Sequence, residues 1–279
     1  MPTSTPSATS PFAILHAQLT QAILACRVDT APKAVHTLRT TTRRLEGLLK
    51  KTLEDHPRAT ELRKTANKSL RQIKKVRQLA AAVRDLDVHM KLLKRVLNPS
   101  APESAQDLAL HHDQRRLHAY LEQKREQAAE VLASDLANRE IRLERALEPT
   151  ATALEELPDS SVEPLATARH WVEQSASQLY RLDGENLHDF RKQTKLARYV
   201  SEMQPPSRAA RAFTRDLLAA QDAIGAWHDL HLLHQEAKAV CGKHSALALL
   251  LATRAKEALK QALAKAKSIH QPQQPARDH

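Results

Sequence analysis

Apolar residues recur at helical spacing along almost the whole chain, and prolines interrupt this pattern at intervals. Between the interruptions the pattern predicts helices over residues 12–27, 33–55, 58–97, 103–147, 163–182, 185–203, 207–240 and 243–268. Several of these helices exceed the average length, so we expect them to pack antiparallel. We predict disordered tails at residues 1–11 and 269–279, where apolar residues are sparse.

An acidic, proline-containing segment near the middle of the chain is the expected hinge between two halves. Pro149, Pro158 and Pro164 lie in this segment. The expected halves are residues 12–157 and 158–268, and both carry several predicted helices. This similarity makes an internal repeat the next feature to look for.

Composition favours an all-α fold. The chain has only 4 glycines among 279 residues, and no two of them are close enough to form a glycine-rich phosphate loop. Aromatic residues make up 3% of the chain, whereas sheets are enriched in aromatic and β-branched residues and their tight turns need glycine. Nucleotide binding by a glycine loop and a many-stranded β fold are therefore excluded.

Positive charge is concentrated in two parts of the chain. The formal net charge is +11 overall. Residues 33–95 hold 18 basic and 6 acidic side chains, residues 96–164 hold 7 and 14, and residues 165–279 hold 17 and 11. A distribution of this kind attracts polyanions but does not select among them. Nucleic acid, acidic lipid and polyphosphate all remain open at this point.

The two cysteines favour a reducing compartment. Cys26 and Cys241 have neither CxxC nor metal-ligand spacing, so they are interpreted as idle or buried thiols. We therefore expect a cytoplasmic protein without a bound metal or other cofactor. Residues 11–26 are interpreted as an amphipathic helix rather than a signal segment, because no basic residue precedes them. No run approaches 18 apolar residues, so no membrane span and no membrane partner are expected.

A basic helix pattern occurs twice. The pattern His-x2-Arg-x3-basic starts at His36 and again at His188, 152 positions later. At 100° per residue, Arg39, Arg43 and Lys50 fall within 60° of His36, while Leu38, Leu45 and Leu49 fall on the opposite side. A second pair of similar segments, 83–88 and 227–232, follows the histidines in the same order. Ordered recurrence of two motifs indicates duplication.

A third basic stripe lies between these motifs in the first half. Four cations spaced 4, 3 and 4 residues apart share one helix face: Lys64, Lys68, Arg71 and Lys75. Stacked like charges repel each other unless an anion lies between them. A solvated basic face is an equally good interpretation of this stripe taken by itself.

Four motifs together resemble a known family. They are Val35-His36-x-x-Arg39-x-x-x-Arg43-Arg44, Val83-Arg84-Asp85-Leu86-Asp87-Val88, Leu187-His188-x-x-Arg191-x-x-x-Lys195-x-x-Arg198 and Ile224-Gly225-x-x-x-Asp229. In this order they resemble the CHAD domain, the conserved histidine α-helical domain, over about residues 12 to 268. The resemblance implies two four-helix bundles related by a pseudo-twofold axis, with a basic central cleft or pore that binds inorganic polyphosphate without catalysis.

The resemblance and the helix faces together give a set of candidate ligand residues. The candidate polyphosphate-binding residues are His36, Arg39, Arg43, Arg44, Lys50, Lys64, Lys68, Arg71, Lys75, His188, Arg191, Lys192, Lys195 and Arg198. Asp85 and Asp229 are expected to orient nearby cations without touching the anion. The chain departs from the family pattern at Glu46, Ala81 and Lys192. Glu46 either weakens the anion site or pairs with Arg43 or Lys50 on its own helix.

The chemistry of polyphosphate suits such a surface. Polyphosphate carries a charge on every unit and no bases, so arginine forks and lysine point charges are what it needs. Few aromatic side chains are available for the base stacking that single-stranded nucleic acids use. Sulfate or phosphate ions are expected to occupy the same cleft.

If His36 and His188 contact the anion, protonation of their rings tightens anion binding below about pH 6.5; otherwise these two histidines are structural.

Alternatives from other classes remain. The runner-up is a nucleic-acid or other polyanion binder driven by counterion release. A histidine phosphotransfer protein ranks behind it, because Thr40 occupies the position where such proteins usually carry glycine. Enzymatic phosphoryl transfer is not expected, since no paired carboxylates accompany the basic stripes. His228, His231 and His234 are interpreted as surface or interface histidines and not as metal ligands. If the protein binds polyphosphate, we also expect it to associate with polyphosphate granules.

Overall fold

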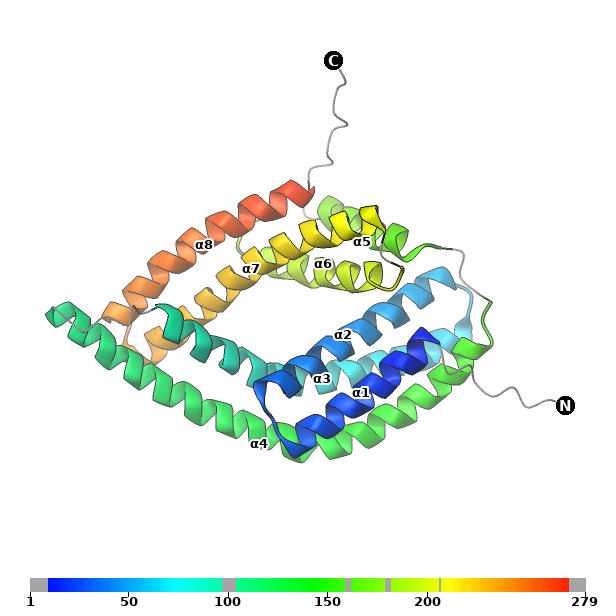
Figure 1. Cartoon of the computed structure of the whole chain (residues 1–279), viewed down its shortest axis with the longest axis horizontal. Coiled ribbons are helices and arrows are strands. Elements are labelled where there is room, and N and C mark those ends of the chain that lie inside the picture. The colour runs from blue at the N-terminus through cyan, green and yellow to red at the C-terminus, as the bar shows by residue number, and fades with distance from the viewer. Residues whose placement is uncertain (1–9, 97–103, 159–161, 179–181, 206, 271–279) are drawn as a thin grey trace, which may run out of the picture. The chain divides into compact units, whose positions relative to one another are not determined.

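The computed structural model describes residues 10–96, 104–158, 162–178, 182–205 and 207–270, and this part of the chain is entirely α-helical outside its turns and connections (Figure 1). The prediction of an all-α fold is confirmed. The helices are α1 (Pro11–Val28), α2 (Pro32–Asp55), α3 (Thr60–Val96), α4 (Ala105–Glu155), α5 (Pro164–Gln178), α6 (Leu187–Ser201), α7 (Arg208–Cys241) and α8 (Ala246–His270). The predicted tails lie almost wholly outside the described residues.

Local capping sets several helix ends close to the predicted positions. Ser10 accepts a hydrogen bond from the Ala13 backbone N–H, and Pro11 occupies the first turn of α1, where proline loses no helical hydrogen bond. Ser207 caps α7 in the same way. Gly242 ends α7 with φ of 100°, a conformation that favours glycine.

One predicted boundary is wrong. The sequence predicts that the helix starting near residue 103 ends at 147, before Pro149, but α4 continues through Pro149 to Glu155. Proline removes one helical hydrogen bond and weakens the adjacent turn. Here the neighbouring Ala146 carbonyl accepts hydrogen bonds from the hydroxyls of Ser69 at 2.7 Å and Thr150 at 3.1 Å. The carbonyl that Pro149 leaves without its helical donor is the preceding one, that of Arg145, so these hydroxyls do not replace the lost bond. Leu147, Ala151 and Leu154 pack in or against the core of the first unit, and this packing stabilises the helix beyond the proline.

The chain divides into two compact units. The first unit comprises Met1–Met90 and Leu121–Pro164, and the second comprises Lys91–Tyr120 and Leu165–His279. This division rests on spatial contacts and assigns 91–120 to the second unit. The halves predicted from the sequence, 12–157 and 158–268, follow the repeated motifs and not these spatial contacts. That division stays a prediction.

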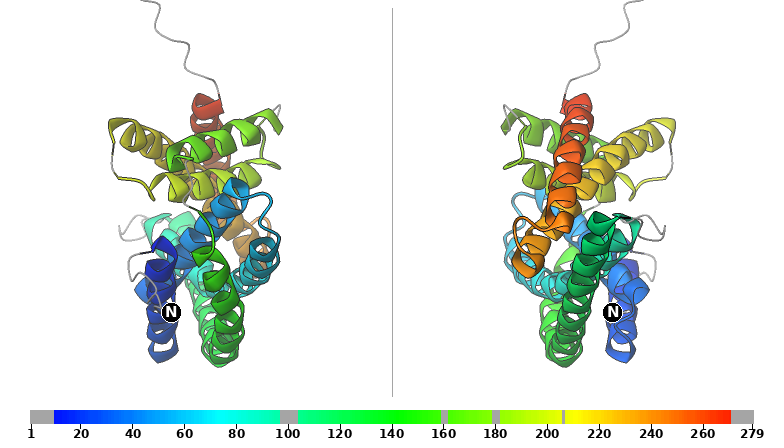
Figure 2. Two further views of the ribbon diagram at one scale, coloured as in Figure 1. Left: turned by 90° about the vertical axis from the view of Figure 1, so that its right-hand side faces the viewer. Right: turned by 90° about the vertical axis from the view of Figure 1, so that its left-hand side faces the viewer.

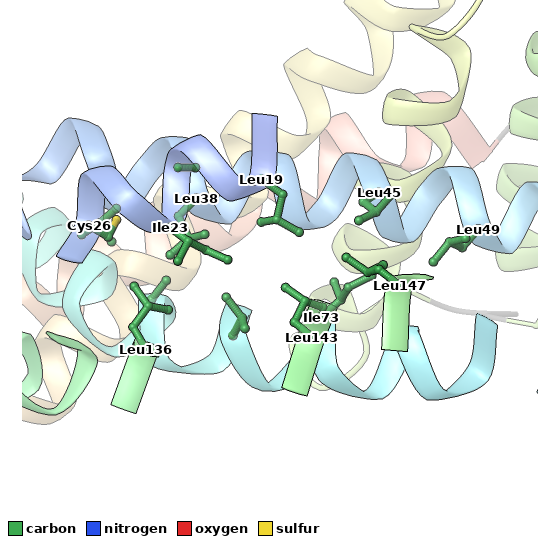
Figure 3. Close-up of a cluster of buried hydrophobic side chains, with 14 of the residues drawn as sticks. Leu19, Ile23, Cys26, Leu38, Leu45, Leu49, Ile73, Leu136, Leu143 and Leu147 are labelled. Atoms are coloured by element: carbon green, nitrogen blue, oxygen red, sulfur yellow. The ribbon is translucent and has the colours of Figure 1, made fainter. Parts of the chain in front are cut away.

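The core of the first unit is built from α1, α2, α3 and α4. Figure 3 shows its side chains converging from all four helices. The labelled residues are Leu19, Ile23, Cys26, Leu38, Leu45, Leu49, Ile73, Leu136, Leu143 and Leu147. All of them are almost completely buried. Helix α1 packs beside α2 (Figures 1 and 2). Because the leucines of α2 repeat at helical spacing and are buried in this core, the opposite side of α2 faces away from it.

In the second unit α7 packs against both α6 and α8. Two apolar clusters hold these helices, one around Phe190 and Trp227 and the other around Trp171 and Val200. Leu187, Phe190 and Ala197 of α6 are fully buried, so α6, like α2, has one side committed to its core. Among the described residues, no helix combines the length and the apolar character that crossing a membrane requires.

Candidate functional site

The predicted cations of α2 lie on the side of the helix that faces away from the core. His36, Arg44 and Lys50 are exposed, and Arg39 and Arg43 are half-buried. We call these five residues the α2 cation face. They share a helix with fully buried leucines, as the 3.6-residue period requires.

A carboxylate lies within the α2 cation face. Glu46 Oε2 is 3.2 Å from Arg43 Nη1, and Glu46 Oε1 is 3.4 Å from Lys50 Nζ. Both contacts confirm the pairings that the sequence suggested for Glu46. A third partner, the guanidinium of Arg77 on α3, also donates a hydrogen bond to Glu46 and was not anticipated.

Asp85 and Asp87 have different partners although they are two residues apart. Asp85 Oδ1 is 3.4 Å from Arg39 Nη1, and the role of Asp85 in orienting a cation stays a prediction. Asp87 is buried and accepts a hydrogen bond from Arg125 Nε of α4 at 3.1 Å. Asp85 of α3 therefore contacts the α2 cation face at Arg39, whereas Asp87 connects α3 to α4.

The third basic stripe is exposed along α3. Lys64, Lys68, Arg71 and Lys75 are all solvent-accessible, and the buried side of this helix carries Ile73 and Val76. Lys64 pairs with Glu61 at 3.8 Å, and both side chains are exposed. Such a pair contributes little to stability. Lys75 lines a groove of about 550 Å³ between α3 and α4, together with the aliphatic side chains of Leu79, Leu86 and Val131.

Two arginines of α6 are held by one residue of α7. Arg191 Nε donates to the backbone carbonyl of Gln221 at 3.3 Å, and Arg198 Nε donates to its side-chain oxygen at 3.1 Å. Gln221 is only 2% exposed, which makes it a fixed anchor. Arg198 also pairs with Glu202 one turn further along α6.

Gly225 of α7 leaves room for the guanidinium of Arg191. A methyl group on Gly225 would lie 2.6 Å from Arg191 Nη2, well inside van der Waals contact. The guanidinium can therefore lie against the backbone of α7 only because residue 225 has no side chain. Ala81 is the corresponding residue of the other repeat, and there Arg39 reaches Asp85 instead.

The two lysines of α6 differ in exposure. Lys195 is half-buried, while Lys192 is exposed and pairs with Asp189 on its own helix at 2.9 Å. We call His188, Arg191, Lys195 and Arg198 the α6 cation face. Lys192 lies at its edge.

His188 stacks on His228 of α7. The ring centroids are 4.6 Å apart with an interplanar angle of 20°. Burial, followed by the charges of His228, Lys192 and Arg191, lowers the pKa of His188 to about 4. His188 is therefore neutral at pH 6 in the anion-free protein, and it tightens binding below about pH 6.5 only if a bound anion raises this pKa.

The three histidines of α7 do not form a metal site within the described residues, where no group of three or more His, Cys, Asp or Glu side chains is arranged to hold a metal ion. His228 Nδ1 lies 3.7 Å from Asp229 Oδ1. Asp229 is thus next to a histidine of its own helix, and its predicted role in orienting cations stays a prediction. His231 is exposed and lies 5.9 Å from the ring of Trp227.

The two repeats use the same positions with different charges. The offset of 152 that relates His36 to His188 also relates Glu46 to Arg198. The offset of 144 that relates the segments 83–88 and 227–232 also relates Arg77 to Gln221. Sequence analysis missed Arg77 and Gln221 because neither belongs to a motif, although extending the second offset by six residues finds both.

Comparison with models of protein families shows to which family this chain belongs. The family model of the CHAD domain matches residues 13–238. The chain belongs to the CHAD domain family. This confirms the resemblance that the four motifs indicate.

Two solved structures share the CHAD fold with this chain. The crystal structure of the CHAD domain from the plant Ricinus communis matches with a TM-score of 0.63 and 22% identity, covering 92% of this chain and 90% of that one. PptA from Streptomyces chartreusis matches with a TM-score of 0.63 and 16% identity, covering 95% and 98%. At these identities the likeness shows the fold alone. No curated protein matches the sequence significantly.

Proposed function

We propose that this CHAD protein binds inorganic polyphosphate through the α2 and α6 cation faces, without catalysis. The observation that carries the proposal is that each unit holds a basic helix whose apolar side is buried in that unit's core and whose cations meet partners on the next helix. Ordered cations of this kind bind a flexible polyanion with little loss of side-chain freedom.

The residues on the two faces suit phosphate oxygens. Arg39, Arg43, Arg191 and Arg198 present guanidinium forks, which hold two oxygens at once. Family membership supports the choice of polyphosphate, because the CHAD resemblance implies that ligand. Free sulfate or phosphate ions are expected to bind the same side chains more weakly.

The arrangement implied by the family is part of the proposal. We infer two four-helix bundles related by a pseudo-twofold axis, with both cation faces lining one basic central cleft or pore. The recurrence of a histidine followed by two cations at one spacing, starting at His36 and again at His188, supports the duplication. If one chain occupies both faces, Arg39→Glu and Arg191→Glu each weaken a single binding event. Two separate sites would instead bind two equivalents of polyphosphate and lose one in each variant.

The main experiment is a titration with polyphosphates of defined length at several salt concentrations. Affinity is expected to rise with chain length and to fall steeply with salt, because many ion contacts form together. Arg39→Glu and Arg191→Glu are expected to weaken binding more than the matched reversals Arg145→Glu in the first unit and Arg215→Glu in the second. Both control arginines are exposed. Equal losses in all four variants would mean diffuse attraction without a site.

Three further measurements test the class of ligand, the absence of catalysis and the localisation that belong to this proposal. Duplex DNA that displaced polyphosphate at equal charge concentration would favour the nucleic-acid alternative. Release of orthophosphate from bound polyphosphate would contradict binding without catalysis. A fluorescently tagged chain is expected in the cytoplasm on polyphosphate granules, and the double variant Arg39→Glu/Arg191→Glu is expected to be diffuse.

A further inference from the structure

Glu46 places a negative charge among the cations of α2. Its carboxylate contacts Arg43 at 3.2 Å, Lys50 at 3.4 Å and the guanidinium of Arg77. The side chains of Glu46 and Arg77 are each 13% exposed, whereas that of Lys50 is 44% exposed. The carboxylate is thus enclosed by its partners, and two of them reach the surface.

This carboxylate is ionised. Burial raises the pKa of Glu46, but the charges of Arg77, Arg43 and Lys50 outweigh burial and hold it below its ordinary value. Burial and the nearby Arg43 lower the pKa of Arg77. The ordinary pKa of arginine is so high that the Arg77 guanidinium stays charged at neutral pH. The cluster therefore consists of three cations around one fixed anion.

The second repeat lacks this anion at the matching position. Arg198 stands where the first repeat has Glu46, and the neutral Gln221 stands where it has Arg77. Arg198 donates to Gln221, so a contact between these two positions is kept while its charges are changed. The α6 cation face also has a carboxylate, Glu202, but it lies one turn beyond Arg198 and pairs with that arginine, so the position of Glu46 itself carries an anion only in the first repeat.

We propose that Glu46 is a built-in competitor of phosphate that closes the α2 cation face to small phosphate anions and leaves it open to long polyphosphate. This inference rests on the proposed function. A small anion must draw Arg43 and Lys50 away from a carboxylate that is tethered to the same helix and so present at high effective concentration. A long chain gains the other cations of the face at the same time, which offsets that competition.

The test compares tripolyphosphate with long-chain polyphosphate on the full chain and on Glu46→Gln. Glutamine keeps the shape of the side chain and removes its charge. Affinity for tripolyphosphate is expected to rise roughly tenfold, within what Coulomb's law allows for charges a few Å apart near a protein surface. Affinity for the long chain is expected to rise by less. Glu61→Gln is the matched control, because it makes the same change in net charge beside an exposed lysine, and about twofold or less is expected.

A second variant covers the case in which Glu46→Gln leaves too much repulsion for the protein to fold. Glu46→Gln/Arg77→Gln removes the enclosed pair, keeps the net charge of the wild type and frees Arg43 and Lys50. Its affinity for tripolyphosphate is expected to exceed that of the wild type.

The outcomes separate the two proposals. If the wild type binds long polyphosphate but Glu46→Gln behaves like Glu61→Gln, or binds tripolyphosphate more weakly than the wild type, the role of Glu46 is refuted and the proposed function stands. If neither the wild type nor any variant binds long polyphosphate, both proposals fail.

Discussion

Gly225 allows a prediction in which stability and binding change independently. In Gly225→Ala the new methyl group would lie 2.6 Å from Arg191 Nη2, and the nearest atoms all belong to that guanidinium. The end of an arginine moves easily, so we expect the guanidinium to leave α7 while the backbone stays in place. The charge of the protein does not change.

The magnitudes for Gly225→Ala follow from the contacts. Alanine in place of glycine inside a helix stabilises by about 1 kcal/mol. The lost hydrogen bond from Arg191 to the Gln221 carbonyl, 3.3 Å long, costs about 0.5–1.5 kcal/mol. The two effects nearly cancel, so the free energy of unfolding is expected to stay within about 1 kcal/mol of the wild type. If the displaced guanidinium loses one phosphate contact worth about 1 kcal/mol, affinity for polyphosphate falls roughly fivefold.

Chemical denaturation and a polyphosphate titration on the same preparations measure both quantities. Gly184→Ala is the control for the binding measurement, because Gly184 lies in a turn outside the helices and a methyl group there would meet Leu259 and Trp227 at an ordinary 3.8 Å. Unchanged affinity in a stable Gly225→Ala protein would show that the place of Arg191 against α7 does not matter for binding. A loss of several kcal/mol in stability would show that the backbone yields and not the guanidinium.

Three other predictions concern buried groups. The pKa of His188 is lowered to about 4 from 6.5, so the unfolded state takes up a proton first as pH falls. The wild type is therefore expected to lose stability between pH 6.5 and 4, and His188→Gln to lose less, as measured by urea denaturation at each pH. Burial raises the pKa of the Cys26 thiol to about 11. A thiol reagent at pH 8 is therefore expected to modify the partly exposed Cys241 first and Cys26 only after denaturation. Early modification of Cys26 would contradict this burial. Ser69→Ala removes the donor to the Ala146 carbonyl beside Pro149, and a loss of about 1–2 kcal/mol in the free energy of unfolding is expected. An unchanged denaturation midpoint would mean that Thr150 alone satisfies this carbonyl.

The helix positions and faces are predictable because they depend on local rules. The apolar period of α2 places its leucines on one side and its cations on the other, and the structure has the same faces. The end of α4 was not predictable by the same rules. Proline normally ends a helix, but the apolar side chains of the turns around and beyond Pro149 pack into the core of the first unit and stabilise this one.

Sequence by itself determined the all-α class, the family and the two helices that carry the cations, because a 3.6-residue period and a few ordered motifs are written locally along the chain. Tertiary structure alone decided which partner each cation meets. Arg77 reaches Glu46 across 31 residues, and Arg191 rests against Gly225 and Gln221, about thirty residues further along the chain. These contacts depend on the register in which neighbouring helices pack, and that register is set by the fit of apolar side chains in the core rather than by the polar residues themselves.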